Sequence, residues 1–458
     1  MKRPNVLLLF TDQQRWDTIG AAGYEHARTP NLDRLAEKGI LFENAFCNCP
    51  VCMPCRQSML SGTYPSAAGC CVNGVEYPEE APHLATFLKA EGYHTANIGK
   101  LHFKNHSNRN HRLAHPSYGF DTAIISDEPG CYDDAYIDWV RERDPAQVEN
   151  CRCDTPPAWT GEPRRKQPRD VLHPYVFEGP EDMTHTAFVA SETVRYIEQH
   201  RNEPFFCIAG FYSPHAPINP PRRFVEMIDP SDMPLPSMRE EENNPEVSAE
   251  DWRRIRAYYT ALVSHIDDRI GLVLEALEKN GLTENTLVLF TSDHGDHLGD
   301  HGKVAKGAPG LDSCAHVPLL ASWPGRIPAG RKKSELIELV DVAPSILDFC
   351  GIARPLSMQG RSFEPLVRDG EYTPRTSAFI EWRDPFKKSW KTVRTDEFKY
   401  CVSNSGTEYL FDLEKDPNEL SSVLSDPEYG NTREDIRREL IRRWFDVEKQ
   451  LPLRTGRY

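Results

Sequence analysis

Short apolar runs alternate with longer amphipathic stretches along the first three quarters of the chain. Apolar runs bounded by polar or turn-forming residues are typical of buried strands, and they span residues 6–11, 41–46, 95–98, 205–212, 286–291 and 317–321. Helical periodicity connects them over residues 31–38, 84–91, 185–200, 249–279 and 341–350. This alternation predicts an α/β fold in which a large, mostly parallel sheet is sandwiched by helices.

The pattern changes at about residue 357. Beyond it, short apolar segments over residues 378–382, 391–393, 399–402 and 409–412 predict strands joined by turns, and residues 433–448 predict a closing helix. We therefore expect two domains: an α/β domain over residues 1–356, and a smaller C-terminal α+β subdomain, an antiparallel sheet plus a helix, over residues 357–458.

Composition and charge exclude several classes of partner. The 458 residues carry a net charge of -15, which argues against general binding to nucleic acid or to anionic membranes, because both require a basic surface. No apolar run approaches the roughly 20 residues that span a bilayer. The first apolar run is too short for a signal peptide and leads into Asp12. The sequence as it stands predicts a cytoplasmic protein, or a periplasmic or secreted one if a leader has been trimmed.

Polar side chains follow four of the predicted strands. In open α/β sheets, ligands bind beyond the carboxyl ends of the strands. The residues at these ends are therefore expected to converge on one site, and they are Asp12 and Gln13, Lys100 and His102, His215, and Asp293 and His294.

Four cysteines precede or open a short predicted helix. Cys47, Cys49, Cys52 and Cys55 have a spacing that resembles a metal-thiolate site, which is one interpretation of this region. We interpret most of the other cysteines as buried thiols, with one disulfide as the alternative. Another interpretation rests on Cys52, Pro54 and Arg56, because this Cys-x-Pro-x-Arg pattern is the one that sulfatase-maturing enzymes convert to formylglycine.

The chain resembles the formylglycine-dependent sulfatases of the alkaline phosphatase superfamily over nearly its whole length. Besides the Cys52 pentapeptide, the matching segments are residues 5–12, 29–33, 99–102, 213–217, 291–299, 317–325 and 410–417. The resemblance implies sulfate ester hydrolysis by the domain over residues 1–356, and maturation of Cys52 by a formylglycine-generating or anaerobic maturase.

The resemblance also implies one divalent metal. Its ligands would be Asp12, Gln13, Asp293 and His294, together with the hydrated formylglycine at Cys52. We expect calcium because carboxylate and amide oxygens suit a hard cation. Gln13 and His294 stand where the family often has aspartate and asparagine, and this neutral pair makes manganese the alternative.

The remaining family residues would handle the oxyanion. Cys52 begins a helix whose free amide groups favour an anion, and Arg56, one turn along, is expected to hold the oxygen of the nucleophile. Lys100 and Lys306 would clamp the sulfate; an ordinary solvated loop lysine is the alternative for Lys306.

Two histidines would move protons. His102 would take a proton from the formylglycine hydrate, and His215 would protonate the leaving alcohol. Lys100 and His102 stand two residues apart, and we expect them to point to the same side of an extended segment.

Two alternatives concern the substrate. The chain departs from the usual sulfatase pattern at four positions: Cys55 replaces a serine, Leu101 replaces a tryptophan, and Gln13 and His294 would be neutral metal ligands. This combination also resembles choline sulfatases and phosphonate monoester hydrolases. A phosphonate monoester or phosphodiester hydrolase is therefore the second candidate function, although the Lys100 and His102 element is sulfatase-like.

A sulfated carbohydrate is the expected substrate because two loops are basic in an otherwise acidic chain. Their residues are Lys104, His106, Arg109, His111 and Arg112, and Arg164, Arg165, Lys166 and Arg169. An ordinary solvated surface is the alternative. Trp382 and Arg383 are expected to pack on a sugar ring.

Overall fold

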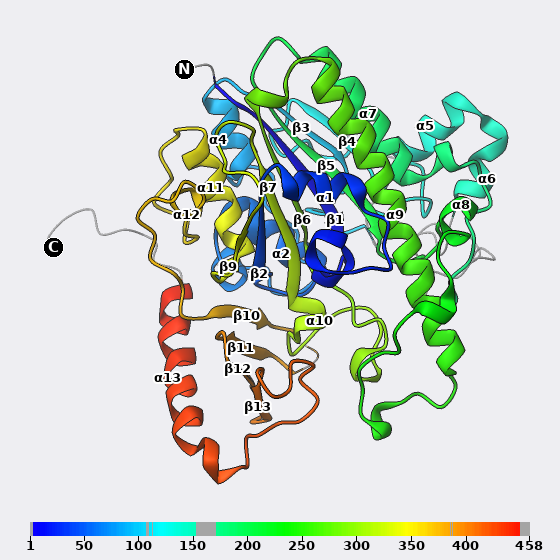
Figure 1. Cartoon of the computed structure of the whole chain (residues 1–458). Helices are drawn as coiled ribbons and strands as arrows, with labels where there is room; N and C mark the ends of the chain where they lie inside the picture. The colour runs from blue at the N-terminus through cyan, green and yellow to red at the C-terminus, as the bar shows by residue number, and fades with distance from the viewer. Residues whose placement is uncertain are drawn as a thin grey trace, which may run out of the picture.

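A nine-stranded sheet organises the larger part of the molecule (Figure 1). The computed structural model describes residues 3–106, 110–111, 113–152, 171–384, 386 and 388–448. Within them the strand order is β4-β3-β5-β1-β6-β7-β2-β8, with β9 also paired to β2. The strands are β1 (Asn5–Asp12), β2 (Ile40–Phe46), β3 (His94–Gly99), β4 (Thr122–Ile125), β5 (Phe205–Pro214), β6 (Thr286–Ser292), β7 (His316–Ser322), β8 (Arg331–Lys333) and β9 (Ile337–Glu338).

The sheet is mostly parallel. Parallel pairing joins β4, β3, β5, β1 and β6, whereas β7 runs antiparallel to both of its neighbours, β6 and β2. Five consecutive strands therefore end at the same edge, and the predicted α/β fold is confirmed.

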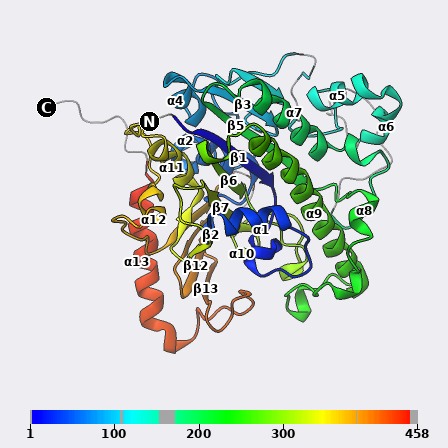
Figure 2. The same ribbon diagram turned by 45° about the horizontal axis from the view of Figure 1, so that its top comes forward.

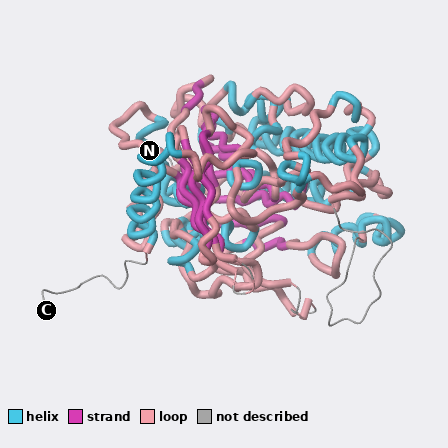
Figure 3. Tube along the Cα trace, turned by 90° about the horizontal axis from the view of Figure 1, so that it is seen from below, coloured by secondary structure: helices cyan, strands magenta, loops and turns pink. Residues whose placement is uncertain are grey.

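Helices cover both faces, as Figure 3 shows with the strands between them. The side chains of β1 alternate: Val6, Leu8 and Phe10 belong to a core with α2, α4, α11 and α12, and Leu7 and Leu9 to a core with α1, α5, α7 and α9. This explains the continuous apolar run, since a strand buried on both faces has no polar side. The helices are α1 (Pro30–Glu37), α2 (Cys52–Ser61), α3 (Pro65–Ala68), α4 (Leu84–Ala90), α5 (Ala135–Arg143), α6 (Val148–Cys151), α7 (His185–Gln199), α8 (Arg222–Val225), α9 (Ala249–Lys279), α10 (Asp312–Ala315), α11 (Val342–Phe349) and α12 (Glu364–Val367).

A separate antiparallel sheet follows near the C-terminus. Its order is β10-β11-β12-β13, from β10 (Ala378–Trp382), β11 (Trp390–Arg394), β12 (Phe398–Ser403) and β13 (Glu408–Asp412), and α13 (Gly430–Val447) packs beside it (Figure 2). Phe379 of β10 shares its core with Tyr64 and Val340 from the larger part of the molecule. The expected antiparallel sheet plus helix is confirmed.

The sequence pattern missed three short strands and several helices. The strands are β4, β8 and β9, and β4 matters most because it borders β3. Its four residues hold two isoleucines beside an exposed alanine, which is too weak a pattern to predict a strand. No helix in the described part of the chain combines the length and the apolar character needed to cross a bilayer.

Candidate active site

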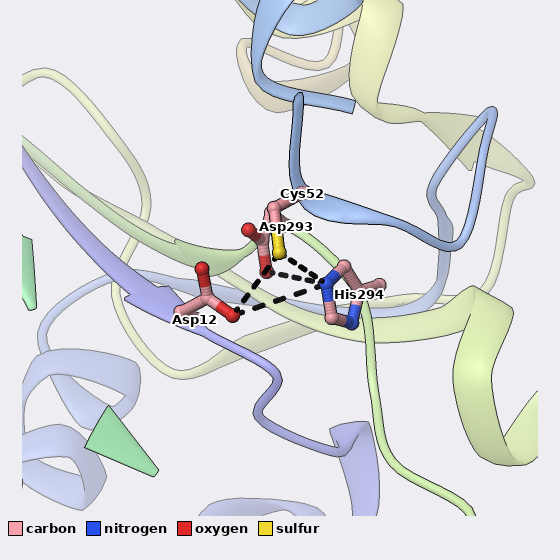
Figure 4. Close-up of side chains that lie close together, drawn as sticks. All are labelled: Asp12, Cys52, Asp293 and His294. Carbon is pink, nitrogen blue, oxygen red and sulfur yellow. Dashed lines mark hydrogen bonds and ion pairs between the residues drawn. The ribbon is translucent and has the colours of Figure 1, made fainter. Parts of the chain in front are cut away.

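Four side chains from three separate elements meet at the carboxyl edge of the large sheet (Figure 4). Asp12 is the last residue of β1, Asp293 and His294 follow β6, and Cys52 is the first residue of α2. The Cys52 Sγ lies 3.4 Å from His294 Nε2 and 3.7 Å from Asp12 Oδ1. His294 Nε2 lies 3.5 Å from Asp293 Oδ1. The predicted convergence of these residues is thus present in the fold.

Arg56 holds both carboxylates from one side. Its Nε donates to Asp293 Oδ2 at 2.8 Å, its Nη2 to Asp12 Oδ2 at 3.2 Å, and its Nη1 to the Lys100 carbonyl at 3.1 Å. The side chains of Arg56, Asp12 and Asp293 are buried. The guanidinium therefore fixes the position of the two acids and compensates their charge. The expected contact of Arg56 with the oxygen of the nucleophile stays a prediction.

Two lysines add positive charge around Asp12. Lys100 Nζ lies 2.8 Å from Asp12 Oδ2, and Lys306 Nζ lies 2.8 Å from Cys52 Sγ and 3.8 Å from Asp12 Oδ1. Burial alone would raise the pKa of Asp12, but the charges of Lys100, Lys306, His215 and Arg56 outweigh burial and hold this pKa well below its ordinary value. Lys306 is therefore part of the cluster and not a solvated loop lysine.

Gly210 of β5 allows Lys100, which follows β3, to lie close to the neighbouring backbone. A Cβ at Gly210 of β5 would lie 2.2 Å from the Lys100 carbonyl oxygen, which is far inside van der Waals contact. Only glycine permits this approach of the two backbones.

Gln13 has the features of an additional ligand. It adopts a left-handed backbone conformation, with φ of 66°, and its N–H donates to Asp293 Oδ1 at 3.0 Å. Its side-chain amide donates to Asp296. The Oε1 atom is buried and has no hydrogen-bond partner among the described residues, which is costly unless a further group binds it.

The residues fit a divalent cation. Arg56 uses the Oδ2 atoms of Asp12 and Asp293, so both Oδ1 atoms face Cys52 and His294. His294 Nδ1 lies 2.9 Å from the Gly295 carbonyl, which directs the lone pair of Nε2 toward the cluster. Burial lowers the pKa of His294 to about 4, so the imidazole is neutral, as a metal ligand must be. Asp12, Gln13, Asp293 and His294 would hold the ion together with the modified Cys52 side chain.

His102 lies beyond β3 rather than on it. β3 ends at Gly99, and His102 has a φ of 56°, so the expected extended geometry of Lys100 and His102 is wrong. The turn is held by Asp127, whose Oδ1 accepts the N–H groups of Leu101 and His102 at 2.9 and 2.7 Å. Burial, followed by the charge of Lys100, lowers the pKa of His102 to about 3, and a neutral imidazole can accept a proton.

His215 directly follows β5 and is positioned by Tyr212 of that strand. Its Nδ1 lies 2.7 Å from the Tyr212 hydroxyl and 2.7 Å from the Ala216 carbonyl. His215 and Lys306 are half-buried whereas Cys52, Asp12 and Lys100 are buried. Of these side chains, His215 and Lys306 are therefore the ones that solvent reaches.

Asp127 and Glu128, which follow β4 after Ser126, were not among the predicted site residues. Glu128 Oε1 lies 3.8 Å from Lys100 Nζ and 4.0 Å from His102 Nε2. Had β4 been recognised, the rule that ligands bind beyond strand ends would have pointed to both acids.

Most of the chain matches the model of one known protein family. A family model described as sulfatase matches residues 4–352. The chain belongs to the sulfatase family. A second model, described as N-sulphoglucosamine sulphohydrolase, C-terminal, matches residues 299–445. This membership places the chain in the alkaline phosphatase superfamily, among the sulfuric ester hydrolases.

Relatives and solved structures agree over nearly the full chain. An arylsulfatase of Clostridium perfringens is 31% identical over 96% of this chain and 94% of its own length. An N-acetylglucosamine-6-O-sulfatase of Bacteroides thetaiotaomicron is 25% identical over 95% of this chain and 85% of its own length. The structure of a phosphonate monoester hydrolase of Agrobacterium radiobacter superimposes with a TM-score of 0.86 at 26% identity, covering 98% of this chain and 97% of that one.

The cysteines of this sulfatase do not support a thiolate metal site. Cys49 donates its S–H to the Cys71 carbonyl and Cys47 to the Cys314 carbonyl, so Cys47 and Cys49 point away from Cys52. The described cysteines are all free thiols, which removes the disulfide alternative for them; Cys153 lies outside the described residues.

The basic loops are only partly described. Arg109, Arg112 and the four basic residues of the 164–169 segment lie outside the described residues. Lys104 pairs with Glu76 and Glu79, so its charge is compensated locally. Arg383 is exposed. Trp382 lies near the site, because a Cβ at Gly307, next to Lys306, would be 3.8 Å from its ring.

Proposed function

We propose that this sulfatase cleaves sulfate esters of carbohydrates with a formylglycine made from Cys52 and one divalent cation. The position of Cys52 carries the proposal. Its side chain begins α2, faces Asp12 and His294, and has the Lys306 ammonium 2.8 Å away. As formylglycine, this residue would supply a hydroxyl nucleophile and a route to expel sulfate afterwards.

The surrounding residues suit an oxyanion that gains negative charge. Lys306 and Lys100 would donate to sulfate oxygens, since an ammonium stabilises charge that develops in a buried site. Arg56 would keep Asp12 and Asp293 in place as ligands. The bound cation would polarise the ester and compensate the charge of its oxygens.

Each histidine is suited to one proton transfer. His215 stands at the half-buried rim, where the leaving alcohol of an ester would lie, and would protonate its oxygen. His102 is buried and neutral at physiological pH, so it would accept the proton that is released when sulfate is expelled.

The ligand set suits two candidate ions. Asp12, Asp293 and Gln13 offer oxygens, which favours calcium, the expected ion. His294 Nε2 adds an imidazole nitrogen, a ligand that suits manganese better than calcium. Metal analysis of the purified protein distinguishes the two ions.

A sulfated carbohydrate is supported by a relative and by the rim of the site. The Bacteroides relative is an N-acetylglucosamine-6-O-sulfatase, and Trp382 lies beside the Lys306 loop, where an indole ring packs well on a sugar face. The phosphonate monoester hydrolase fold match supports the second candidate, a phosphonate monoester or phosphodiester hydrolase.

Kinetics with matched esters separate the two candidates. Sulfate monoesters and phosphonate monoesters both carry a single negative charge, so total charge does not discriminate between them. A sulfate presents a third terminal oxygen, for which Lys100 and Lys306 offer donors, whereas a phosphonate needs room for a carbon substituent. We expect kcat/KM for an aryl sulfate to exceed that for the aryl phosphonate with the same leaving group. The reverse order would establish the second candidate.

A further inference from the structure

One buried acid, Glu128, contacts the groups around both histidines. Its side chain is 3% exposed. Its Oε1 atom lies 3.6 Å from His106 Nδ1, 3.8 Å from Lys100 Nζ and 4.0 Å from His102 Nε2. Its Oε2 atom accepts a hydrogen bond from the Tyr212 hydroxyl at 3.2 Å.

Tyr212 extends these contacts to His215. The single hydrogen of the Tyr212 hydroxyl is shared between Glu128 Oε2, at 3.2 Å, and the Ala216 carbonyl, at 2.8 Å, and the hydroxyl oxygen lies 2.7 Å from His215 Nδ1. The Tyr212 ring lies under the Lys100 ammonium at 4.5 Å, which fixes the phenol in place. Glu128 thus has two branches: its charge lies 4.0 Å from His102 Nε2, with no hydrogen bond between the two described side chains, and its hydrogen bond to Tyr212 leads to His215.

The same acid could be read as a metal ligand, because His102, His106 and Glu128 lie close enough to bind an ion. Lys100 argues against this. Its ammonium is 3.8 Å from the Glu128 oxygen that would bind the ion. Glu128 is the one carboxylate of this group, and it cannot compensate both this ammonium and a divalent ion, whereas the group at Asp12 has a second carboxylate, Asp293. The geometry favours a role within the protein's own network.

We propose that Glu128 is a positioning residue for both proton transfers: it acts on His102 through its charge, across 4.0 Å, and on His215 through Tyr212. The proposal rests on the proposed function of the two histidines. The carboxylate would stabilise the His102 ring when it gains a proton, because opposite charges attract strongly in a buried site. It would also keep the Tyr212 hydroxyl, and with it the His215 ring, oriented toward the leaving group.

Two conservative variants separate the branches. Glu128→Gln keeps the shape and an acceptor oxygen but removes the charge, so it affects both branches. Tyr212→Phe keeps the ring under Lys100 and removes only the hydroxyl that connects Glu128 to His215. Glu192→Gln is the matched control, because Glu192 is also a buried acid, at 5% exposure, and its partners are Arg143 and Arg195 on the helical side.

The experiment measures kcat and KM for an aryl sulfate and an alkyl sulfate. A good leaving group needs little protonation and a poor one needs much, so Tyr212→Phe should lower kcat for the alkyl ester about tenfold more than for the aryl ester. Glu128→Gln should lower kcat about tenfold for the aryl ester and about a hundredfold for the alkyl ester, with KM little changed. The double variant should lose no more with the alkyl ester than Glu128→Gln alone.

Two kinds of outcome would overturn the proposal, and two further cases are separated from it. A uniform loss across both esters in Glu128→Gln, or additive losses in the double variant, would mean that Glu128 does not act through Tyr212. A loss equal to that of Glu192→Gln would mean a merely structural role. If Glu128→Gln does not fold, the ester ratio of Tyr212→Phe decides alone. If the wild type prefers phosphonate monoesters, the proposed function fails, and the same ratios are measured with aryl and alkyl phosphonate monoesters.

Discussion

Replacing Arg56 by methionine should destabilise the protein and inactivate it together. Methionine keeps much of the side-chain volume but leaves Asp293 without the 2.8 Å bond and Asp12 without the 3.2 Å bond that Arg56 provides. Removing one partner from a buried ion pair costs about 3–5 kcal/mol, because an uncompensated charge stays buried. Lys100 still compensates Asp12 at 2.8 Å, so most of the cost falls on Asp293.

This free energy corresponds to a measurable melting shift. At about 2 cal/mol/K per residue, a chain of 458 residues has an unfolding entropy of about 1 kcal/mol/K, so Tm should fall by roughly 3–5 °C. Calorimetry in chelator is the assay, since a bound cation would compensate the same carboxylates. Arg56→Lys should lose less stability but still most of its activity, because an ammonium cannot span both acids.

The control is Arg239→Met. Arg239 pairs with Glu242 on the surface, and exposed ion pairs contribute little, so its Tm should stay unchanged. An unchanged Tm for Arg56→Met in chelator would show that Arg56 does not compensate the charge of the two acids.

Three further predictions concern the metal, the histidines and acid stability. The Asp293→Asn variant should lose bound metal, measured by elemental analysis, and activity, measured as turnover, to the same extent. Full activity of the wild type in chelator would contradict a role for the metal. His215→Ala should harm a sugar sulfate far more than an aryl sulfate, whereas His102→Ala should slow both alike; equal loss ratios would rule out this division. Burial alone would raise the pKa of Asp127, but the hydrogen bond and charge of His115 outweigh it and lower the pKa, so this acid stabilises the fold above about pH 4. The Tm gap between wild type and Asp127→Asn should therefore shrink as the pH falls below that value, and a constant gap would contradict it.

Much of the fold can be predicted from the order of apolar and polar residues along the chain. Strands buried on both faces produce continuous apolar runs, which is why β1, β5 and β6 were predicted within two residues of their observed ends. The metal-site residues followed from these strands, because Asp12 and Asp293 stand at their carboxyl ends. The pattern failed at β4, whose weak apolar character hid Asp127 and Glu128.

Other features depend on contacts between distant segments. The left-handed conformations of Gln13 and His102 have no strong local signal, because a positive φ is uncommon for any residue other than glycine. They are held by Asp293 and Asp127, which follow neighbouring strands. The partners of Arg56 were also unpredictable, since they lie on β1, after β6 and after β3. Sequence motifs name the residues of this site, but only the fold shows which of them touch.

Peptide mass spectrometry shows whether Cys52 is converted to formylglycine, on which the proposed chemistry depends. The protein should be made with and without a formylglycine-generating or anaerobic maturase, and the peptide that contains Cys52 compared with its turnover. We expect an aldehyde residue at position 52 in proportion to specific activity, and an inactive but folded Cys52→Ala variant. Active protein whose position 52 is wholly an unmodified thiol would contradict the account.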